Sequence, residues 1–359
     1  MKRIPLYFVG AALAATLCGC EHPPVEAVQD GFRGTGMDQM INPRSDAIVA
    51  AKNVVPEPLP AASGEGPLAS AVYQNVQVLN DLSIGQFTRV MLAMTQWVAP
   101  PDQACNYCHG GNMASDDKYT KVVARRMLQM VRHINSDWQD HVGRTGVTCY
   151  TCHRGNAVPQ YVWFKSPGES KARGLAASNT NLFSSVGTVS SASLPYDPFT
   201  SYLLGSEEIR VNGDAALPVR GQNVSLQRTE LTYSLMLHMS SGLGVNCDYC
   251  HNTRSLSQWS TSTPQRVTAW YGIRMARNLN NEYLVPLTPV FPEHRLGYKG
   301  DVAKVNCQTC HQGVFKPLYG ESMLKDYPEL SGSHTAAVAP AAVPPVASLG
   351  PVTSGAAPN

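Results

Sequence analysis

Eight of the ten cysteines lie in four motifs of the form Cys-x-x-Cys-His. This pattern is typical of covalent c-type haem attachment. In that chemistry the two thiols add to the vinyl groups of one porphyrin, and the next imidazole ligates the iron. The sequence therefore predicts four covalently bound haem c groups, held by Cys105, Cys108 and His109; Cys149, Cys152 and His153; Cys247, Cys250 and His251; and Cys307, Cys310 and His311.

Structural zinc sites and redox disulfides are the alternative uses of paired cysteines. Zinc does not require a histidine after every second cysteine. A redox role for four motifs would leave the same trailing histidine as a coincidence. The pattern therefore favours haem over both alternatives.

Each haem iron needs a sixth ligand or an open coordination position. A Met-x-x-Met pair precedes each of the first three motifs, and the pairs are Met91/Met94, Met127/Met130 and Met236/Met239. Two such residues lie within about 60° of each other around a helix, so both can face a haem. Core packing is the commoner role of a methionine. The spacing alone does not decide which member of a pair ligates.

The fourth motif departs from this pattern. Met275 lies 32 residues before Cys307, and Asn278 replaces the second methionine. A ligand other than methionine is therefore open for the fourth haem. The remaining histidines of the body are His133, His141, His238 and His294. Since the second haem already has a methionine candidate, His141 is free to reach another haem.

Helices must carry these ligands. Ser83 and Gln86 form a capping-box pattern that predicts a helix start. Ser115, followed by two aspartates, predicts a second start. The third helix is expected over 226–240, and Thr263 followed by Pro264 predicts the N-cap and first position of a fourth.

The repeated unit of helix, loop and Cys-x-x-Cys-His indicates a mainly α protein, a multihaem c-type cytochrome of four haem units. Long irregular segments connect the units, and two haem pairs suggest an internal pseudo-twofold. The expected divisions are a signal peptide (1–19), an extended N-terminal arm (20–69), the first haem pair (70–160), a connector (161–221), the second haem pair (222–330) and a disordered tail rich in Pro and Ala (331–359).

The N-terminus predicts export. Lys2 and Arg3 precede an apolar run over 4–17, which is typical of a secretory signal and too short to span a bilayer. The run ends at a lipoprotein-like cleavage box, so Cys20 is expected to become a lipid anchor in the membrane. Ordinary signal cleavage is the alternative.

The formal charge of +2 argues against a nucleic-acid partner, because such proteins usually carry a strongly basic face. Charged residues make up 15% of the chain, which also disfavours a disordered charged chain.

Several short sequence segments, in their order along the chain, resemble the segments of one protein family. These segments are GFRGTGM, VVARRML, TGVTCYTCHRG, STPQR, GIRM, CHQGV and LKDYPEL. In these segments the chain closely resembles the tetrahaem cytochrome subunit of purple-bacterial photosynthetic reaction centres, from Cys20 to about residue 330.

The resemblance implies specific distal ligands: Met91, Met127 and Met236 for haems 1, 2 and 3, and His141 for haem 4. The interval between Trp97 and Cys105 is one residue longer than in the family pattern, which keeps Met94 as an alternative to Met91. Arg266 matches a family arginine beside the propionates of haem 3. A salt bridge on the helix surface is its alternative role.

The resemblance also implies an electron carrier and no enzyme. Such a subunit sits on the periplasmic face of the photosynthetic inner membrane and re-reduces the bacteriochlorophyll special pair held by the membrane subunits. Its haems lie in the order 3, 4, 2, 1 from that pair outward. Its donor is a soluble c-type cytochrome or a high-potential iron–sulfur protein. A periplasmic multihaem oxidoreductase and a quinol-linked electron-transfer cytochrome are the alternatives.

Acidic residues flank the first motif at Asp102, Asp116 and Asp117. One hypothesis is that they form a docking face for a basic donor, where charge would mainly raise the association rate. The alternative is a solvated loop with acids at a helix start.

Overall fold

A computed structural model of the chain describes residues 26–30, 37–41, 43–165, 194–195, 197–211 and 224–332. The signal peptide, the proposed anchor at Cys20 and the tail after residue 332 lie outside these ranges, as does most of the connector. The described part is mainly helical, as predicted.

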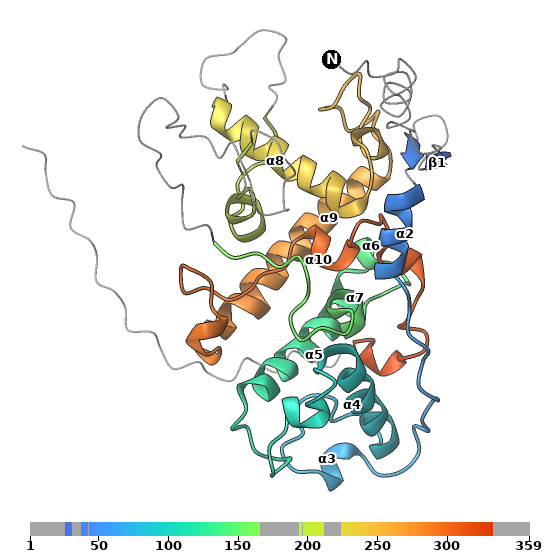
Figure 1. The fold of residues 1–359 in the computed structure, drawn as a ribbon, viewed down its shortest axis with the longest axis vertical. Coiled ribbons are helices and arrows are strands. Elements are labelled where there is room, and N and C mark those ends of the chain that lie inside the picture. The colour runs from blue at the N-terminus through green and yellow to red at the C-terminus, as the bar shows by residue number, and fades with distance from the viewer. Residues whose placement is uncertain are drawn as a thin grey trace, which may run out of the picture.

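The described elements form an elongated body (Figure 1). Helices α3 and α4 lie at one end, α8 lies at the other, and α7 and α10 lie between them. The α-helices are α2 (Pro43–Lys52), α3 (Ala69–Val72), α4 (Ile84–Val98), α5 (Tyr119–Asp137), α6 (Gln139–Val142), α7 (Cys149–His153), α8 (Leu226–Leu243), α9 (Gln265–Asn278) and α10 (Cys307–His311).

Shorter helical turns connect these helices. Two are π-helices, η2 (Thr200–Leu204) and η4 (Leu279–Leu284). The 3₁₀ turns are η1 (Ala104–Tyr107), η3 (Cys247–Tyr249), η5 (Val285–Val290), η6 (Glu293–Arg295), η7 (Pro317–Gly320) and η8 (Pro328–Leu330). Strands β1 (Glu26–Asp30) and β2 (Met37–Ile41) pair antiparallel, with Glu26 opposite Ile41. The predicted extended arm therefore contains a hairpin and the ten-residue helix α2.

The start of α4 confirms the capping-box prediction. The Ser83 hydroxyl accepts a hydrogen bond from the Gln86 amide at 3.2 Å, and the Gln86 side chain accepts one from the Ser83 amide at 3.2 Å. This exchange satisfies two amides that a helix start leaves without partners. Val90, Ala93 and Trp97 then form the buried face of the helix.

Helix α5 begins later than predicted, at Tyr119 with Lys118 as N-cap. Asp116 does not cap the helix, because its carboxylate binds Arg125 at 3.0 Å and Lys121 at 3.3 Å. Helix α9 begins one residue late, with Pro264 as the N-cap. Thr263 does not cap it, because its hydroxyl donates to the Tyr249 carbonyl at 2.6 Å.

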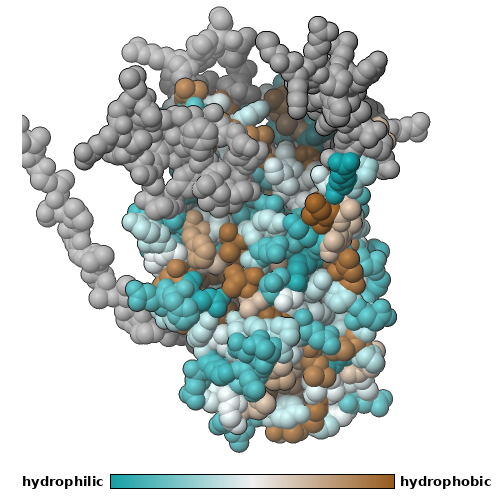
Figure 2. Space-filling view, in the orientation of Figure 1, coloured by the Kyte–Doolittle hydropathy of each residue, from teal (hydrophilic) through white to brown (hydrophobic). Residues whose placement is uncertain are grey.

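Two hydrophobic clusters hold most of the body together, beside a small third one around Val245 and Tyr249. The larger one joins α4, α5 and α7 to the segment that contains Tyr327 and Leu330. The second joins η2, α8 and α9 around Phe199, Tyr202 and Leu235. On the face shown in Figure 2, hydrophobic and hydrophilic residues are interspersed. Over the described ranges, the structure has no helix with the length and apolarity that crossing a membrane requires.

A buried ion pair ties the last described segment to α4. Arg89 and Glu329 approach to 3.4 Å, with side chains 6% and 4% exposed. The Arg89 guanidinium also lies 4.0 Å from the centre of the Tyr327 ring and donates to the carbonyls of Leu59 and Pro60. Residues 59–60 and the LKDYPEL segment therefore both contact Arg89.

We predict that Glu329→Gln lowers the free energy of unfolding by about 3 kcal/mol, because it leaves the buried Arg89 charge uncompensated. Urea unfolding followed by tryptophan fluorescence measures the change. The control is Glu321→Gln, which removes the exposed pair with Lys325 and should leave the unfolding midpoint unchanged. Equal midpoints for the two variants would contradict the prediction.

Candidate cofactor site

The four Cys-x-x-Cys-His motifs adopt two local structures. The first and third motifs form the 3₁₀ turns η1 and η3. The second and fourth form the five-residue helices α7 and α10. Each of these helices ends at a residue in the left-handed conformation, with φ 49° at Arg154 and φ 49° at Gln312. The motifs therefore match in alternation, first with third and second with fourth.

Two buried asparagines place α7 and α10 in the same way. The Asn135 amide donates to the Val147 carbonyl at 2.9 Å and its oxygen accepts from the Val147 amide at 2.8 Å. Asn280 makes the same exchange with Val305, at 3.0 and 2.9 Å. Both valines lie two residues before the first cysteine of their motif. Each asparagine also donates to a distant carbonyl, Leu330 for Asn135 and Leu203 for Asn280.

Two threonines place the other pair of motifs. The Thr120 hydroxyl, at the start of α5, donates to the Tyr107 carbonyl at 2.5 Å. The Thr263 hydroxyl, just before α9, donates to the Tyr249 carbonyl at 2.6 Å. Both tyrosines stand between the cysteines of their motif. One hydrogen bond of the same kind therefore ties each 3₁₀ motif to the helix that follows it.

All four motif histidines hold their rings by the same contact. In each, Nδ1 lies within hydrogen-bond distance of a backbone carbonyl; the carbonyls are those of Met113, Asn156, Leu256 and Val314 for His109, His153, His251 and His311. A carbonyl only accepts, so Nδ1 carries the proton and Nε2 is the basic nitrogen. Metal-ligating histidines are oriented in this way.

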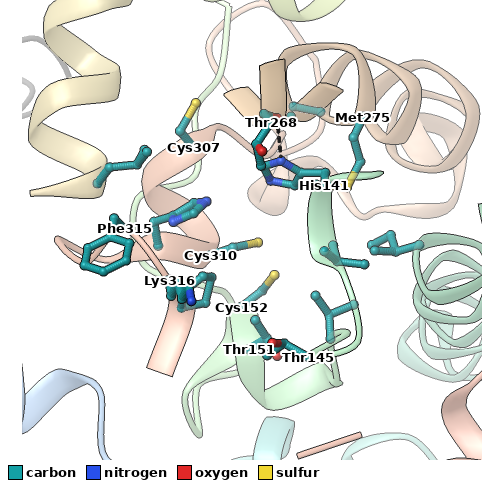
Figure 3. Close-up of a pocket in the computed structure, with 18 of the residues that line it drawn as sticks. His141, Thr145, Thr151, Cys152, Thr268, Met275, Cys307, Cys310, Phe315 and Lys316 are labelled. Atoms are coloured by element: carbon teal, nitrogen blue, oxygen red, sulfur yellow. Dashed lines mark hydrogen bonds between the residues drawn. The ribbon is translucent and has the colours of Figure 1, made fainter. Parts of the chain in front are cut away.

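His141 shares this arrangement although it belongs to no motif. Its Nδ1 donates to the Thr268 carbonyl at 2.9 Å, drawn as the dashed line in Figure 3. Its ring centre lies 6.0 Å from that of His311. Two imidazoles that bind one metal ion with bonds of about 2 Å have ring centres roughly 6 Å apart. The two rings therefore fit a single iron between them.

The electrostatics of this pair suit ligation. Burial lowers the pKa of His311 to about 4, with a smaller contribution from His141. Burial also lowers the pKa of His141. Both rings are therefore neutral near pH 7, which is the form that binds a metal.

The pair borders a cavity of about 430 Å³. Cys152 and Cys310 line it, as does Cys250, so motifs two, three and four all reach this space. Figure 3 shows Cys152, Cys310 and His141 around the opening. The volume falls within the range of about 300–1,000 Å³ that is usual for small-molecule and cofactor sites. With this cavity, the thiols and the imidazoles form a donor set that fits covalent haem.

Two of the other histidines occupy different environments. His133 uses both ring nitrogens, with Nδ1 2.7 Å from Asp137 and Nε2 2.9 Å from Asn278. His238 is fully buried on α8, with its ring centre 4.6 Å from that of Phe199. The Nε2 of His133 is therefore hydrogen-bonded to the protein, whereas the hydrogen bond described for His141 uses its Nδ1.

The methionine pairs divide between two surroundings. The second members of two pairs, Met130 and Met239, line the cavity together with Met275. The first members, Met127 and Met236, are half-buried and pack against the larger and the smaller cluster respectively. Met91 and Met94 are both half-buried against the larger cluster. Met91 and Met94 therefore have the same surroundings in the structure.

Arg266 lies beside the third motif. Its guanidinium stacks 4.1 Å from the centre of the Trp259 ring and donates to Ser262 at 2.7 Å. Burial lowers its pKa, and the nearby Cys250 thiol opposes that shift. Arg266 thus contacts an aromatic ring, a hydroxyl and a carbonyl, whereas its alternative role predicted a salt bridge on the helix surface.

The packing orders the motifs along the body. Helix α4, before the first motif, packs on α7, and α7 packs on α10. Helix α10 in turn packs closely on α8, which precedes the third motif. The approach is close at Gly242, where a Cβ would meet the Gln308 backbone at 3.2 Å. The Cys152 and Cys310 thiols lie close enough to shift each other's pKa, so motifs two and four are direct neighbours. The resulting order is one, two, four, three.

The three acids near the first motif are exposed, but their charges differ in availability. Asp116 is held by Arg125 and Lys121, and the Arg125 hydrogen bond is the main cause that lowers the pKa of Asp116. Its charge is therefore largely compensated. The docking hypothesis now rests on Asp102 and Asp117.

Sequence reasoning missed several residues of the site. Asn135, Asn280 and Thr268 act through backbone contacts that no motif announces. Gly272 was also missed, although it determines how close α9 comes to His141. The position of Asn135, twelve residues before the first Val-x-Cys of its helix–loop unit, is not repeated at Asn280, so a search for equal spacing would also have failed.

Haem-attachment motifs on short helical turns, with every motif imidazole held through Nδ1 and with His141 and His311 bordering a cavity, define a c-type cytochrome. The family model for the photosynthetic reaction centre cytochrome C subunit matches residues 21–331. The chain belongs to this family and is an electron-transfer component of photosynthesis with covalently bound haem c.

Individual relatives agree with this assignment. The chain is 51% identical to the photosynthetic reaction center cytochrome c subunit of Rubrivivax gelatinosus, over 94% of this chain and 92% of the relative. It is 52% identical to the protein of the same name from Thermochromatium tepidum, over 92% and 81%. A cytochrome c-554 from Chloroflexus aurantiacus is 27% identical over 68% and 69%. These names do not favour the enzymatic or quinol-linked alternatives.

We predict that Gly272→Ala disturbs the His141–His311 pair. A Cβ at residue 272 would lie 2.5 Å from Cε1 of His141, whose ring is held by Thr268. The ring must therefore move, and we expect a changed visible and electron paramagnetic resonance spectrum for one haem.

Gly85→Ala is the control for the Gly272 variant. Glycine 85 also lies in a helix, but its nearest neighbour to a new Cβ is at 3.6 Å, an ordinary contact. Its haem spectrum should match that of the wild type. An unchanged spectrum in Gly272→Ala would show that His141 is not held where the structure puts it.

Proposed function

We propose that this chain binds four haem c groups and passes electrons through them to the photo-oxidised special pair of a reaction centre. The observation that carries the proposal is the His141–His311 pair, with ring centres 6.0 Å apart and both Nδ1 atoms engaged. This arrangement supports His141 as the distal ligand of haem 4. The shared backbone contact of the four motif histidines supports them as the proximal ligands.

The remaining distal ligands are Met91, Met127 and Met236 for haems 1, 2 and 3. Met130 and Met239 both line the shared cavity, and Met127 and Met236 are preferred to them on family resemblance. Met91 is preferred to Met94 on family resemblance. The contacts of Arg266 beside Cys250 support its role near haem 3.

The haems form two pairs related by a pseudo-twofold. Three matched features support this symmetry: the alternating motif structures, the Asn135 and Asn280 exchanges, and the Thr120 and Thr263 hydrogen bonds. The motif packing order of one, two, four, three supports a haem row with haems 1 and 3 at its ends.

The chain sits at the periplasmic face of the photosynthetic membrane, with haem 3 toward the reaction-centre membrane subunits. A soluble c-type cytochrome or a high-potential iron–sulfur protein supplies electrons at haem 1. A diacylglycerol on Cys20 anchors the chain after the signal peptide is removed. The family match over residues 21–331 lies within the chain that would remain after this cleavage.

The chemistry that haem supplies when bound is reversible one-electron transfer at iron. The protein residues set the conditions for it. The carbonyls at Nδ1 fix the motif imidazoles, and motifs two, three and four share one cavity. Methionine ligands raise a reduction potential relative to histidine, so the His141–His311 site should have the lowest potential.

Flash spectroscopy on membranes tests the function. After a saturating flash, haem oxidation should appear within milliseconds or faster as the special pair is re-reduced. Membranes that lack the chain should keep the special pair oxidised for longer. Haems that stay reduced beside an oxidised special pair would refute the proposed role.

Ligand variants test the assignments separately. Replacing Met127 or Met236 by His should lower the potential of one haem by more than about 59 mV, a tenfold change in the redox equilibrium. His141→Met should raise the lowest potential in the same way. Met130→Leu and Met239→Leu are matched controls, and both should leave four potentials in place. A variant with no shift would remove its residue from the ligand set.

A further inference from the structure

Arg154 follows the proximal histidine of the second motif and reaches the fourth motif through the Cys310 carbonyl. We propose that its guanidinium is a fixed positive charge at the junction of motifs two and four. There it raises the reduction potentials of both haems held by those motifs, and Asn53 positions it. This inference rests on the proposed function, because it concerns haems 2 and 4.

The backbone directs Arg154 into this junction. It caps the C-terminus of α7 in the left-handed conformation, with φ 49° and ψ 40°. Its Nη2 donates to the Cys310 carbonyl at 3.2 Å and to Oδ1 of Asn53 at 3.2 Å. Its charge acts on both the Cys152 and the Cys310 thiol, the two attachment atoms that lie side by side. The cation therefore reaches the attachment edges of two haems.

No carboxylate compensates this cation among the described residues, where no ion pair within 4.0 Å involves Arg154. The arginines at 89, 125 and 132, in contrast, each bind an acid. In addition, Nε and Nη1 of Arg154 are buried and have no hydrogen-bond partner. A half-buried cation that no described carboxylate compensates is costly to place, so its presence calls for a reason.

Capping is not that reason. Gln312 occupies the equivalent position on α10, with nearly identical backbone angles, φ 49° and ψ 41°. A neutral side chain thus serves the same turn. At this position the second motif is followed by a positive charge and the fourth motif is not. The charge lies where these two motifs meet.

Asn53 holds the guanidinium without neutralising it. It is 4% exposed and lies directly after α2. Its Oδ1 accepts from Arg154, and its Nδ2 donates to the carbonyls of Val49 at 2.9 Å and Gln312 at 3.4 Å. An aspartate at this position would accept the same bond but cancel the charge. The neutral amide keeps the full field of the guanidinium.

The sign of the effect follows from charge. A ferric haem carries one positive charge more than a ferrous haem, so a nearby cation disfavours oxidation and raises the potential. Solvent screens the half-buried charge of Arg154 less than it would an exposed one. A guanidinium stays protonated at any physiological pH, so the effect should not depend on pH near neutrality.

The test is an equilibrium redox titration of the purified cytochrome–reaction-centre complex, resolved by haem absorption bands. Arg154→Gln copies the residue found at Gln312. We expect the oxidised-to-reduced ratio to rise about tenfold for haems 2 and 4, a downward shift of about 59 mV each. Haems 1 and 3 should shift by less. Arg154→Lys should recover most of the potential.

Asn53→Asp provides a second variant that leaves Arg154 in place. It should lower the same two potentials, and it keeps the proposal testable if Arg154→Gln does not assemble. Arg144→Gln is the matched control, since it removes an exposed charge from the same unit and should shift no potential.

Unchanged potentials of haems 2 and 4 in haem-loaded Arg154→Gln or Asn53→Asp would overturn the inference. A shift centred on haems 1 or 3, or one that Arg154→Lys does not recover, would also overturn it. The titration needs no light-driven step. A failed flash experiment with shifted potentials would therefore count against the proposed function alone, and the reverse result against Arg154 alone.

Discussion

The contact between an imidazole Nδ1 and a backbone carbonyl is the interaction on which the site depends. It recurs at all four motif histidines and at His141. Each bond assigns the proton to Nδ1 and aims Nε2 away from the backbone. Four of these carbonyls lie three to five residues after their histidine, so the motif and the turn that follows it orient the ring together. At His141 the carbonyl comes from α9, and only the folded body can supply it.

The source of the carbonyl decides which part of the structure must position each histidine, and it differs between the motif histidines and His141. A motif histidine needs correct local structure, which η1, η3, α7 and α10 provide. His141 needs α6 and α9 to pack closely, and Gly272 permits that approach because it has no side chain. The paired asparagines then fix α7 and α10 relative to the helices before them. Asn135 also binds the Leu330 carbonyl of the second haem half, and Asn280 binds the Leu203 carbonyl of the connector, so each exchange is joined to a distant segment.

Much of this arrangement could be predicted from the sequence. The four motifs, the helical character, the start of α4 and the segment of α8 followed from local patterns, because covalent attachment and helix capping depend on residues close in the chain. The starts of α5 and α9 were misplaced, since Asp116 and Thr263 have tertiary partners that compete with capping. The helix α2 was missed within a segment rich in Pro and Gly.

The contacts that sequence could not supply are those between distant segments. Asn135 with Leu330, and Asn280 with Leu203, join parts of the chain separated by a whole haem unit. The N-terminal segment is joined to the body by two further contacts of this kind. Asn53 binds Arg154 and so reaches motifs two and four. Arg89 binds both residue 59 and Glu329, and so links this segment to the LKDYPEL sequence. The arm before residue 70 therefore does more than lead the chain to a membrane. It closes the body at the buried Arg89 and the half-buried Arg154, and its described residues supply a carboxylate to neither. Arg89 finds its counter-ion in Glu329, whereas Arg154 receives only the neutral amide of Asn53. The arm thus contributes to stability at Arg89. At Arg154 it leaves a net positive charge beside the thiols of motifs two and four.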